Sequence, residues 1–210
     1  MILVSDTSVL IDLERGGLLE AIFALPHEFA VPDVLYDREM QGEWGERLVR
    51  LGLRVAEVSE RGVGNALRYR QQRGALSVPD SFALALAKER KWVLLTGDGQ
   101  LRELAGGESV ECHGVLWLLD IIEEAGSPAI HVLHEGLQVI AGHPRCRLPR
   151  REIAIRLELS SHHQAGMSKL RRGFHGSRFR SQILNIGVWL AKEQREISAR
   201  ISNISAQTEF

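Results

Sequence analysis

Short apolar runs alternate with helical patterns along the first 125 residues, and this alternation most restricts the folds open to the chain. Ile2-Leu3-Val4 and Trp92-Val93-Leu94-Leu95 have the length of strands, and the second run is continuous, as in a strand buried on both faces. Further strands are expected near residues 29–31, 53–58 and 110–112. Strands and helices at this spacing indicate a parallel sheet covered by helices. The helical patterns fall at residues 9–23 with a break at Gly16-Gly17, from 33, at 63–72, from 80, and at 100–104, 115–124, 130–140 and 150–159.

Charge is divided unevenly along the chain. Residues 1–144 hold 22 acids and 13 bases, a balance of −9, whereas residues 145–210 hold 5 acids and 13 bases, a balance of +8; the two balances sum to the net charge of −1. An acidic body would repel nucleic acid unless a metal ion held its carboxylates together. The basic end suggests an extension that binds anions or folds back on the acidic body.

Composition favours a cytoplasmic protein without a membrane span. The most apolar stretch, from Val115 to Ile122, is broken by Asp120 and is far shorter than the roughly 18 residues that a span needs. The charged Asp6 interrupts the apolar N-terminus before the apolar core of a signal peptide could form. The two cysteines, Cys112 and Cys146, fit a reducing compartment and lack metal-ligand spacing.

Four acids stand where a parallel sheet could gather them. Asp6 and Asp98 each follow a predicted strand directly, and ligands bind at the carboxyl ends of parallel strands. Asp80 begins a helix after Pro79, and Glu39 lies on the helix that starts at residue 33. If the four converge, their oxygens suit Mg²⁺ or Mn²⁺. Each also has a structural interpretation, as a helix cap, a first-turn acid or a solvated side chain.

The residues around these acids resemble those of the PIN-domain family, most closely the VapC-like toxin ribonucleases of type II toxin–antitoxin pairs. The resemblance covers about residues 1–125, extends loosely through Arg147-Leu148-Pro149 to about 159, and rests on short motifs in the family's order. These motifs are Val4-Ser5-Asp6-Thr7-Ser8 with Leu10-Ile11-Asp12, Glu39, Ser77-Val78-Pro79-Asp80, Leu95-Thr96-Gly97-Asp98 and His113-Gly114-Val115-Leu116-Trp117.

The resemblance implies an α/β/α sandwich and an endoribonuclease that hydrolyses RNA with Mg²⁺ or, alternatively, Mn²⁺. It implies that four acids hold one or two ions and that Thr7 and Thr96 support them through hydrogen bonds. It further implies an antitoxin partner that blocks the acidic pocket, and a homodimer. Many members carry an additional acid at the position of Gln100, and the amide in its place disfavours tight binding of a second ion. The four acids are Asp6, Glu39, Asp80 and Asp98.

Two questions stay open at the level of sequence. The chain could be a non-catalytic PIN-like module that binds RNA or protein, although the presence of all four acids disfavours this. The predicted division is a PIN-like nuclease domain over 1–159 and a helical, partly disordered basic extension over 160–210, with a linker at 160–181 and a helix at 183–201. The extension could tune RNA affinity, act as a solubilising segment, or derive from a shifted reading frame.

Overall fold

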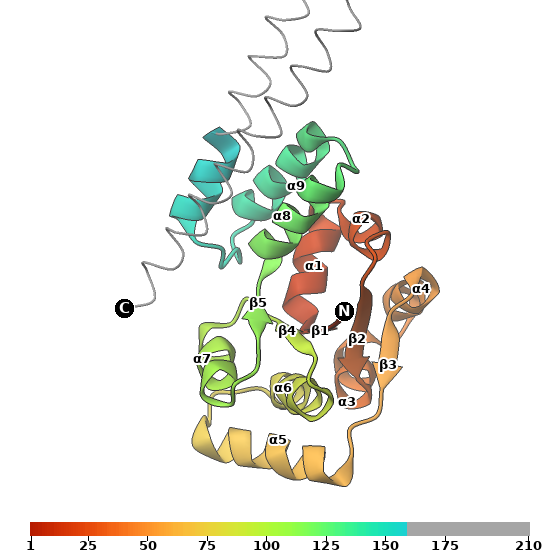
Figure 1. Ribbon diagram of the computed structural model, residues 1–210, viewed down its shortest axis with the longest axis vertical. Helices are drawn as coiled ribbons and strands as arrows, with labels where there is room; N and C mark the ends of the chain where they lie inside the picture. Colours follow the sequence, from red (N-terminus) through yellow and green to blue (C-terminus); the bar gives the residue numbers. More distant parts are fainter. Residues whose placement is uncertain (159–210) are drawn as a thin grey trace, which may run out of the picture. The chain divides into compact units, whose positions relative to one another are not determined.

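Five parallel strands form the central sheet of the computed structural model, which describes residues 1–158. The strands are β1 (Ile2–Ser5), β2 (Glu28–Pro32), β3 (Arg54–Ala56), β4 (Val93–Leu95) and β5 (Cys112–His113). Their order is β3-β2-β1-β4-β5, and every neighbouring pair is parallel (Figure 1). The predicted α/β class is therefore confirmed, with a sheet that is parallel throughout.

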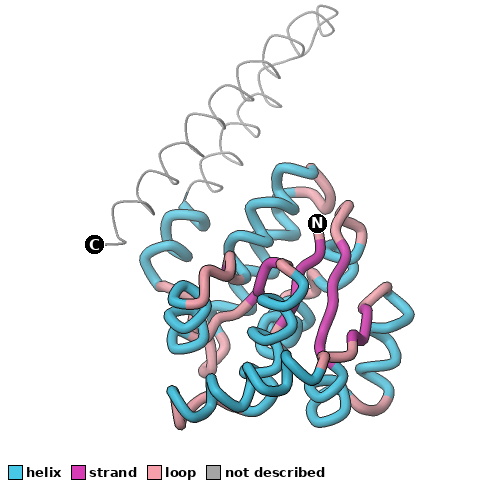
Figure 2. Tube along the Cα trace, turned by 60° about the horizontal axis from the view of Figure 1, so that its bottom comes forward, coloured by secondary structure: helices cyan, strands magenta, loops and turns pink. Residues whose placement is uncertain are grey.

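Helices cover both faces of the sheet. They are α1 (Thr7–Arg15), α2 (Leu19–Phe23), α3 (Asp33–Leu35), the π-helical turn η1 (Tyr36–Met40), α4 (Glu43–Leu51), α5 (Glu60–Gln72), α6 (Val78–Arg90), α7 (Gly99–Gly107), α8 (Val115–Ala125) and α9 (Ile130–Gly142). On one face α1, α2, α8 and α9 pack together, whereas α6 contacts β1, β2 and β4 on the other face and α5 packs against α6. In Figure 2 the strands accordingly lie enclosed among helices.

Helix α6 packs against the face of the sheet that lies lower in Figure 1. Six consecutive residues, 82–87, are buried, and three of them are alanines, which let a helix approach a sheet closely. The helix begins where Ser77 accepts a hydrogen bond of 3.1 Å from the Asp80 amide, and Pro79 occupies its first turn without losing a needed donor. A rigid, buried helix therefore carries Asp80.

Three local features differ from the sequence-based expectations. Helix α4 was not anticipated, because charged residues fill the segment before Leu51. The last strand lies at Cys112–His113 rather than at 110–112, since Val110 closes the turn after α7 with a hydrogen bond to Ala105. The expected helix from residue 33 is confirmed, but its second half is a π-helical turn.

The C-terminal part of the described chain is helical over residues 150–158, in agreement with the expected helix there. Contacts group the described residues 1–158 into one compact unit. Within residues 1–158 no helix has the length and apolarity of a membrane span. The predicted linker at 160–181 and helix at 183–201 lie outside the described residues, and the division at 159/160 stays a prediction.

Candidate active site

Two adjacent strands end side by side and bring Asp6 and Thr96 together. In the parallel pair formed by β1 and β4, Ser5 is aligned with Leu95. The Asp6 amide donates a hydrogen bond of 3.0 Å to the Leu95 carbonyl. Asp6 and Thr96 therefore follow their strands at the same edge of the sheet, which is where parallel sheets bind ligands.

The Asp6 carboxylate is almost completely buried, with 2% of the residue exposed. Its Oδ1 accepts hydrogen bonds from the Val9 amide (2.9 Å) and the Ser8 hydroxyl (2.8 Å), and its Oδ2 accepts one from the Thr96 hydroxyl. Burial raises the pKa of Asp6 above its ordinary value of 3.8. These three hydrogen bonds lower the pKa in part, and the nearby charge of Asp80 raises it further. The site thus holds a buried acid whose charged form is disfavoured by its surroundings.

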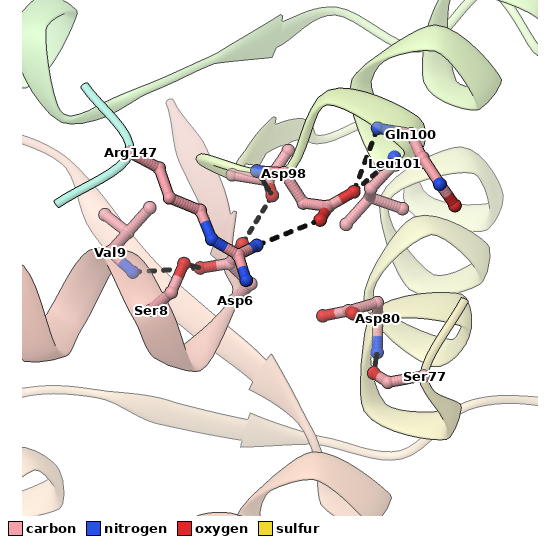
Figure 3. Close-up of polar contacts among 10 residues, drawn as sticks. Asp6, Ser8, Val9, Ser77, Asp80, Asp98, Gln100, Leu101 and Arg147 are labelled. Carbon is pink, nitrogen blue, oxygen red and sulfur yellow. Dashed lines mark hydrogen bonds and ion pairs between the residues drawn. The ribbon is translucent and has the colours of Figure 1, made fainter. Parts of the chain in front are cut away.

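Asp98 lies on the next loop and shares Thr96 with Asp6. Its Oδ1 caps α7 by accepting from the amides of Gln100 (2.9 Å) and Leu101 (3.0 Å), and its own amide donates to the Thr96 hydroxyl at 3.0 Å. Its Oδ2 instead faces Arg147, whose Nη1 lies 3.2 Å away (Figure 3). The Thr96 hydroxyl therefore links the backbone of Asp98 to the carboxylate of Asp6.

Asp80 points from the first turn of α6 toward the same space (Figure 3). Burial raises the pKa of Asp80 above 3.8, and the bond with Ser77 lowers it. The charges of Glu39 and Asp98 raise this pKa, and the charge of Arg147 lowers it. Asp80 is therefore close enough to Glu39 and to Asp98 to interact with their charges.

Glu39 is linked to the site through Thr7 and through its charge interaction with Asp80. It is exposed on η1, and the Thr7 hydroxyl donates a hydrogen bond to its Oε2. Thr7 directly follows Asp6 and begins α1. Both predicted supporting threonines thus donate to carboxylates, Thr7 to Glu39 and Thr96 to Asp6.

We call Asp6, Glu39, Asp80 and Asp98 the carboxylate cluster. Asp6 and Asp98 do cap helices, as the structural interpretation proposed, but each uses Oδ1 for its cap and directs Oδ2 elsewhere. The cap and a ligand-binding role are therefore compatible. The roles of these residues in metal binding and catalysis stay predictions.

The donor set of the cluster fits a hard divalent cation, because it offers carboxylate oxygens from four separate elements and no sulfur or nitrogen. The geometry is open: among residues 1–158, no three acidic, histidine or cysteine side chains are already gathered around a metal position. Glu39 is bonded to Thr7, and Asp98 is bonded to Arg147. These four carboxylates are the residues that would hold such a cation.

The raised pKa values predict a specific pH dependence of stability. A carboxyl whose pKa is higher in the folded than in the unfolded protein stabilises the fold while it is protonated, and this contribution is lost as pH rises from about 4 through the raised value. The free energy of unfolding contributed by Asp6 and Asp80 should therefore fall with rising pH in EDTA.

Addition of Mn²⁺ at about pH 8 should raise the melting temperature of the wild type. An equal rise for Asp6→Asn would contradict this prediction.

Sequence reasoning missed Arg147 as a member of the site. Arg147 lies in the segment Arg147-Leu148-Pro149, and no periodicity marks it as a site residue. Ser8 and Ser77 lie within the motifs around Asp6 and Asp80, where no local pattern predicts their hydrogen bonds to Asp6 and to the Asp80 amide. Only the three-dimensional structure shows Arg147 beside Asp98, 49 residues away along the chain.

A protein-family model described as a PIN domain (DUF3368) matches residues 2–161. Among solved structures, the chain is similar to a PilT N-terminus domain protein, SSO1118, from the archaeon Sulfolobus solfataricus P2. The sequence identity is 15%, the TM-score is 0.41, and the match covers 58% of this chain and 93% of that one. No significant match was found among curated proteins.

Proposed function

Because this chain belongs to the PIN-domain family, whose members are generally nucleases, we propose that it is a divalent-metal-dependent endoribonuclease with the carboxylate cluster as its catalytic centre. The observation that carries this proposal is the convergence at one sheet edge of acids from four elements, with one of them buried. Burial of an acid beside other acids raises the free energy of the charged form, which a divalent cation would offset.

The chain's own residues suggest a division of tasks. Asp6 is fixed by hydrogen bonds from the Val9 amide and the Ser8 and Thr96 hydroxyls, so its position changes little when a ligand arrives. Asp80 is held by the buried start of α6. These carboxylates would hold a divalent ion, which would polarise a phosphodiester oxygen and lower the pKa of a water for in-line attack on phosphorus. We assign Asp6 and Asp80 as the ligands that the fold holds in place, and the more exposed Glu39 and Asp98 as the other two ligands.

We further propose that the chain is the toxin of a toxin–antitoxin pair, with Mg²⁺ as its working ion, RNA as its substrate and a homodimer as its assembly. An antitoxin would silence it by placing a cation in the cluster. The neighbourhood of Asp98 favours this, since a guanidinium already forms an ion pair with that carboxylate.

Cleavage of defined oligonucleotides tests the proposed reaction. Labelled RNA and DNA of the same sequences are incubated with the purified chain and Mg²⁺, Mn²⁺ or EDTA, and the ends of the products are determined. Attack by water should give RNA products without 2′,3′-cyclic phosphates, and EDTA should stop it. Cyclic phosphate ends, or cleavage that persists in EDTA, would refute the proposed chemistry. Retention of RNA without any cleavage would instead support the non-catalytic binding module.

Glu39 and its neighbour Asp37 provide a matched pair of variants. Both are exposed acids on η1, but only Glu39 is held toward the cluster by Thr7. Glu39→Gln should lower the rate of RNA cleavage by about 100-fold or more, because loss of a group that only orients a metal ligand already costs about 10- to 100-fold. Asp37→Asn should retain the wild-type rate. Equal rates for both variants would remove Glu39 from the site.

A further inference from the structure

We propose that Arg147 is the phosphate-binding residue of the active site, which leaves Asp98 and holds a phosphate of the RNA strand next to the carboxylate cluster. This inference rests on the proposed ribonuclease function and names a substrate contact within it.

The ion pair between Arg147 and Asp98 is suited to exchange rather than to structural support. It is a single contact of 3.2 Å, and 74% of the Arg147 side chain is exposed. Exposed pairs of this kind contribute little to stability. The cap of α7 does not depend on it, because Asp98 makes that cap with its other oxygen. Loss of the pair therefore frees Asp98 Oδ2 without disturbing the helix.

The backbone that presents Arg147 is nevertheless well anchored. On its N-terminal side, α9 is held by buried residues such as Ile140. The Cys146 amide donates a hydrogen bond of 2.9 Å to the His143 carbonyl. On its C-terminal side Arg156 binds Asp120 of α8 through two hydrogen bonds, Nε to Oδ1 at 3.0 Å and Nη2 to Oδ2 at 2.8 Å. The exposed Arg147 side chain can therefore exchange Asp98 for another anion while its backbone stays in place.

The guanidinium lies where a nucleic acid needs a cation. It extends over the space bordered by Asp6, Asp80 and Asp98 (Figure 3), and its charge acts on Asp80 as well as on Asp98. Four carboxylates repel a polyanion, so a positive group beside them lowers the free-energy cost of bringing a phosphate close. An arginine matches a phosphate particularly well, because its planar fork donates two parallel hydrogen bonds.

The sequence around Arg147 continues this positive surface. Residues 145–151 contain four arginines and no acid, and all four arginines are exposed. They stand out because residues 1–144 carry a net charge of −9. A basic segment that contacts the cluster through Arg147 supplies the positive charge that the phosphates of a bound strand need.

The alternative role of the same contact is to block the site. In that case Arg147 would act only as a plug that competes with the metal for Asp98, and its removal would make the enzyme more active. The two roles predict different RNA affinities for Arg147→Ala, weakened if Arg147 binds phosphate and unchanged if it is only a plug, so they can be separated by binding measurements that need no cleavage.

The test compares wild type, Arg147→Ala, Arg147→Lys and the control Arg61→Ala, an exposed arginine on α5. The dissociation constant for a labelled RNA is measured in EDTA over a series of salt concentrations. Arg147→Ala should weaken binding about tenfold and reduce the slope of log affinity against log salt by about 1. Arg147→Lys should fall between, because it keeps the charge but loses the fork. Arg61→Ala should bind as the wild type does.

Other results would overturn the inference. Unchanged RNA affinity in Arg147→Ala, with tighter Mn²⁺ binding in calorimetry or faster cleavage, would assign Arg147 as a plug. A melting temperature well below that of wild type would assign it a structural role. These results are distinct from failure of the nuclease proposal: a chain that binds RNA through Arg147 without cutting it would refute only the nuclease, and one that cuts RNA with no help from Arg147 would refute only this inference.

Discussion

Asp6→Asn should lower RNA cleavage about 1,000-fold and at the same time stabilise the metal-free fold. The loss follows because a bound metal contributes several kcal/mol of transition-state stabilisation, and each 1.36 kcal/mol is a factor of ten in rate. The gain follows because burial disfavours the Asp6 carboxylate, whereas a neutral amide of the same size carries no such penalty. Cleavage rates and melting curves in EDTA at about pH 8 measure the two effects.

The opposite signs make this prediction specific. Since the wild-type carboxyl is protonated in acid, the melting temperature advantage of Asp6→Asn should shrink as the pH is lowered toward about 4. A variant that is both inactive and less stable at every pH would show that Asp6 serves mainly as the cap of α1, through its bond to the Val9 amide.

Gly45→Ala should reduce the free energy of unfolding by about 2 to 3 kcal/mol, at the upper end of the cost of overfilling a packed interior. A Cβ at this position would lie 1.8 Å from the Met40 carbonyl oxygen and 3.1 Å from the Tyr36 ring. Both contacts belong to η1, so α4 could fit only if that turn moved. Because Glu39 lies on η1, the same change should impair cleavage. Urea denaturation and the cleavage assay measure both.

Gly64→Ala is the matched control. Gly64 lies within α5, and nothing lies within 4 Å of the position that its Cβ would take. Alanine is favoured over glycine inside a helix by up to about 1 kcal/mol, so this variant should equal or exceed the stability of the wild type. Similar stability for the two alanine variants would show that α4 and η1 adapt without cost.

The sequence was most informative where one local rule decides the structure. The apolar run before Asp6 and the run before Asp98 predicted two strands followed by acids, and the structure has both strands next to each other. The proline and aspartate at 79–80 predicted a helix start, which Ser77 caps. Strand ends and helix starts are encoded within a few residues, so these positions could be read directly.

Sequence patterns were insufficient where distant segments must meet. The π-helical turn that carries Glu39 depends on close packing against Gly45, and no short pattern encodes that contact. The position of Arg147 depends on α9 and on the bonds between Arg156 and Asp120, which lie 36 residues apart. The proximity of the four acids likewise results from strand order and helix packing rather than from spacing along the chain.

The most direct test of the central claim is a two-by-two cleavage experiment. A mixed RNA pool is incubated with folded wild type or Asp6→Asn, each in Mg²⁺ or in EDTA, and the products are followed over time. We predict cleavage only by wild type in Mg²⁺, with the three other reactions at background. Cleavage in EDTA, or equal cleavage by both proteins, would contradict a metal-dependent reaction at the carboxylate cluster.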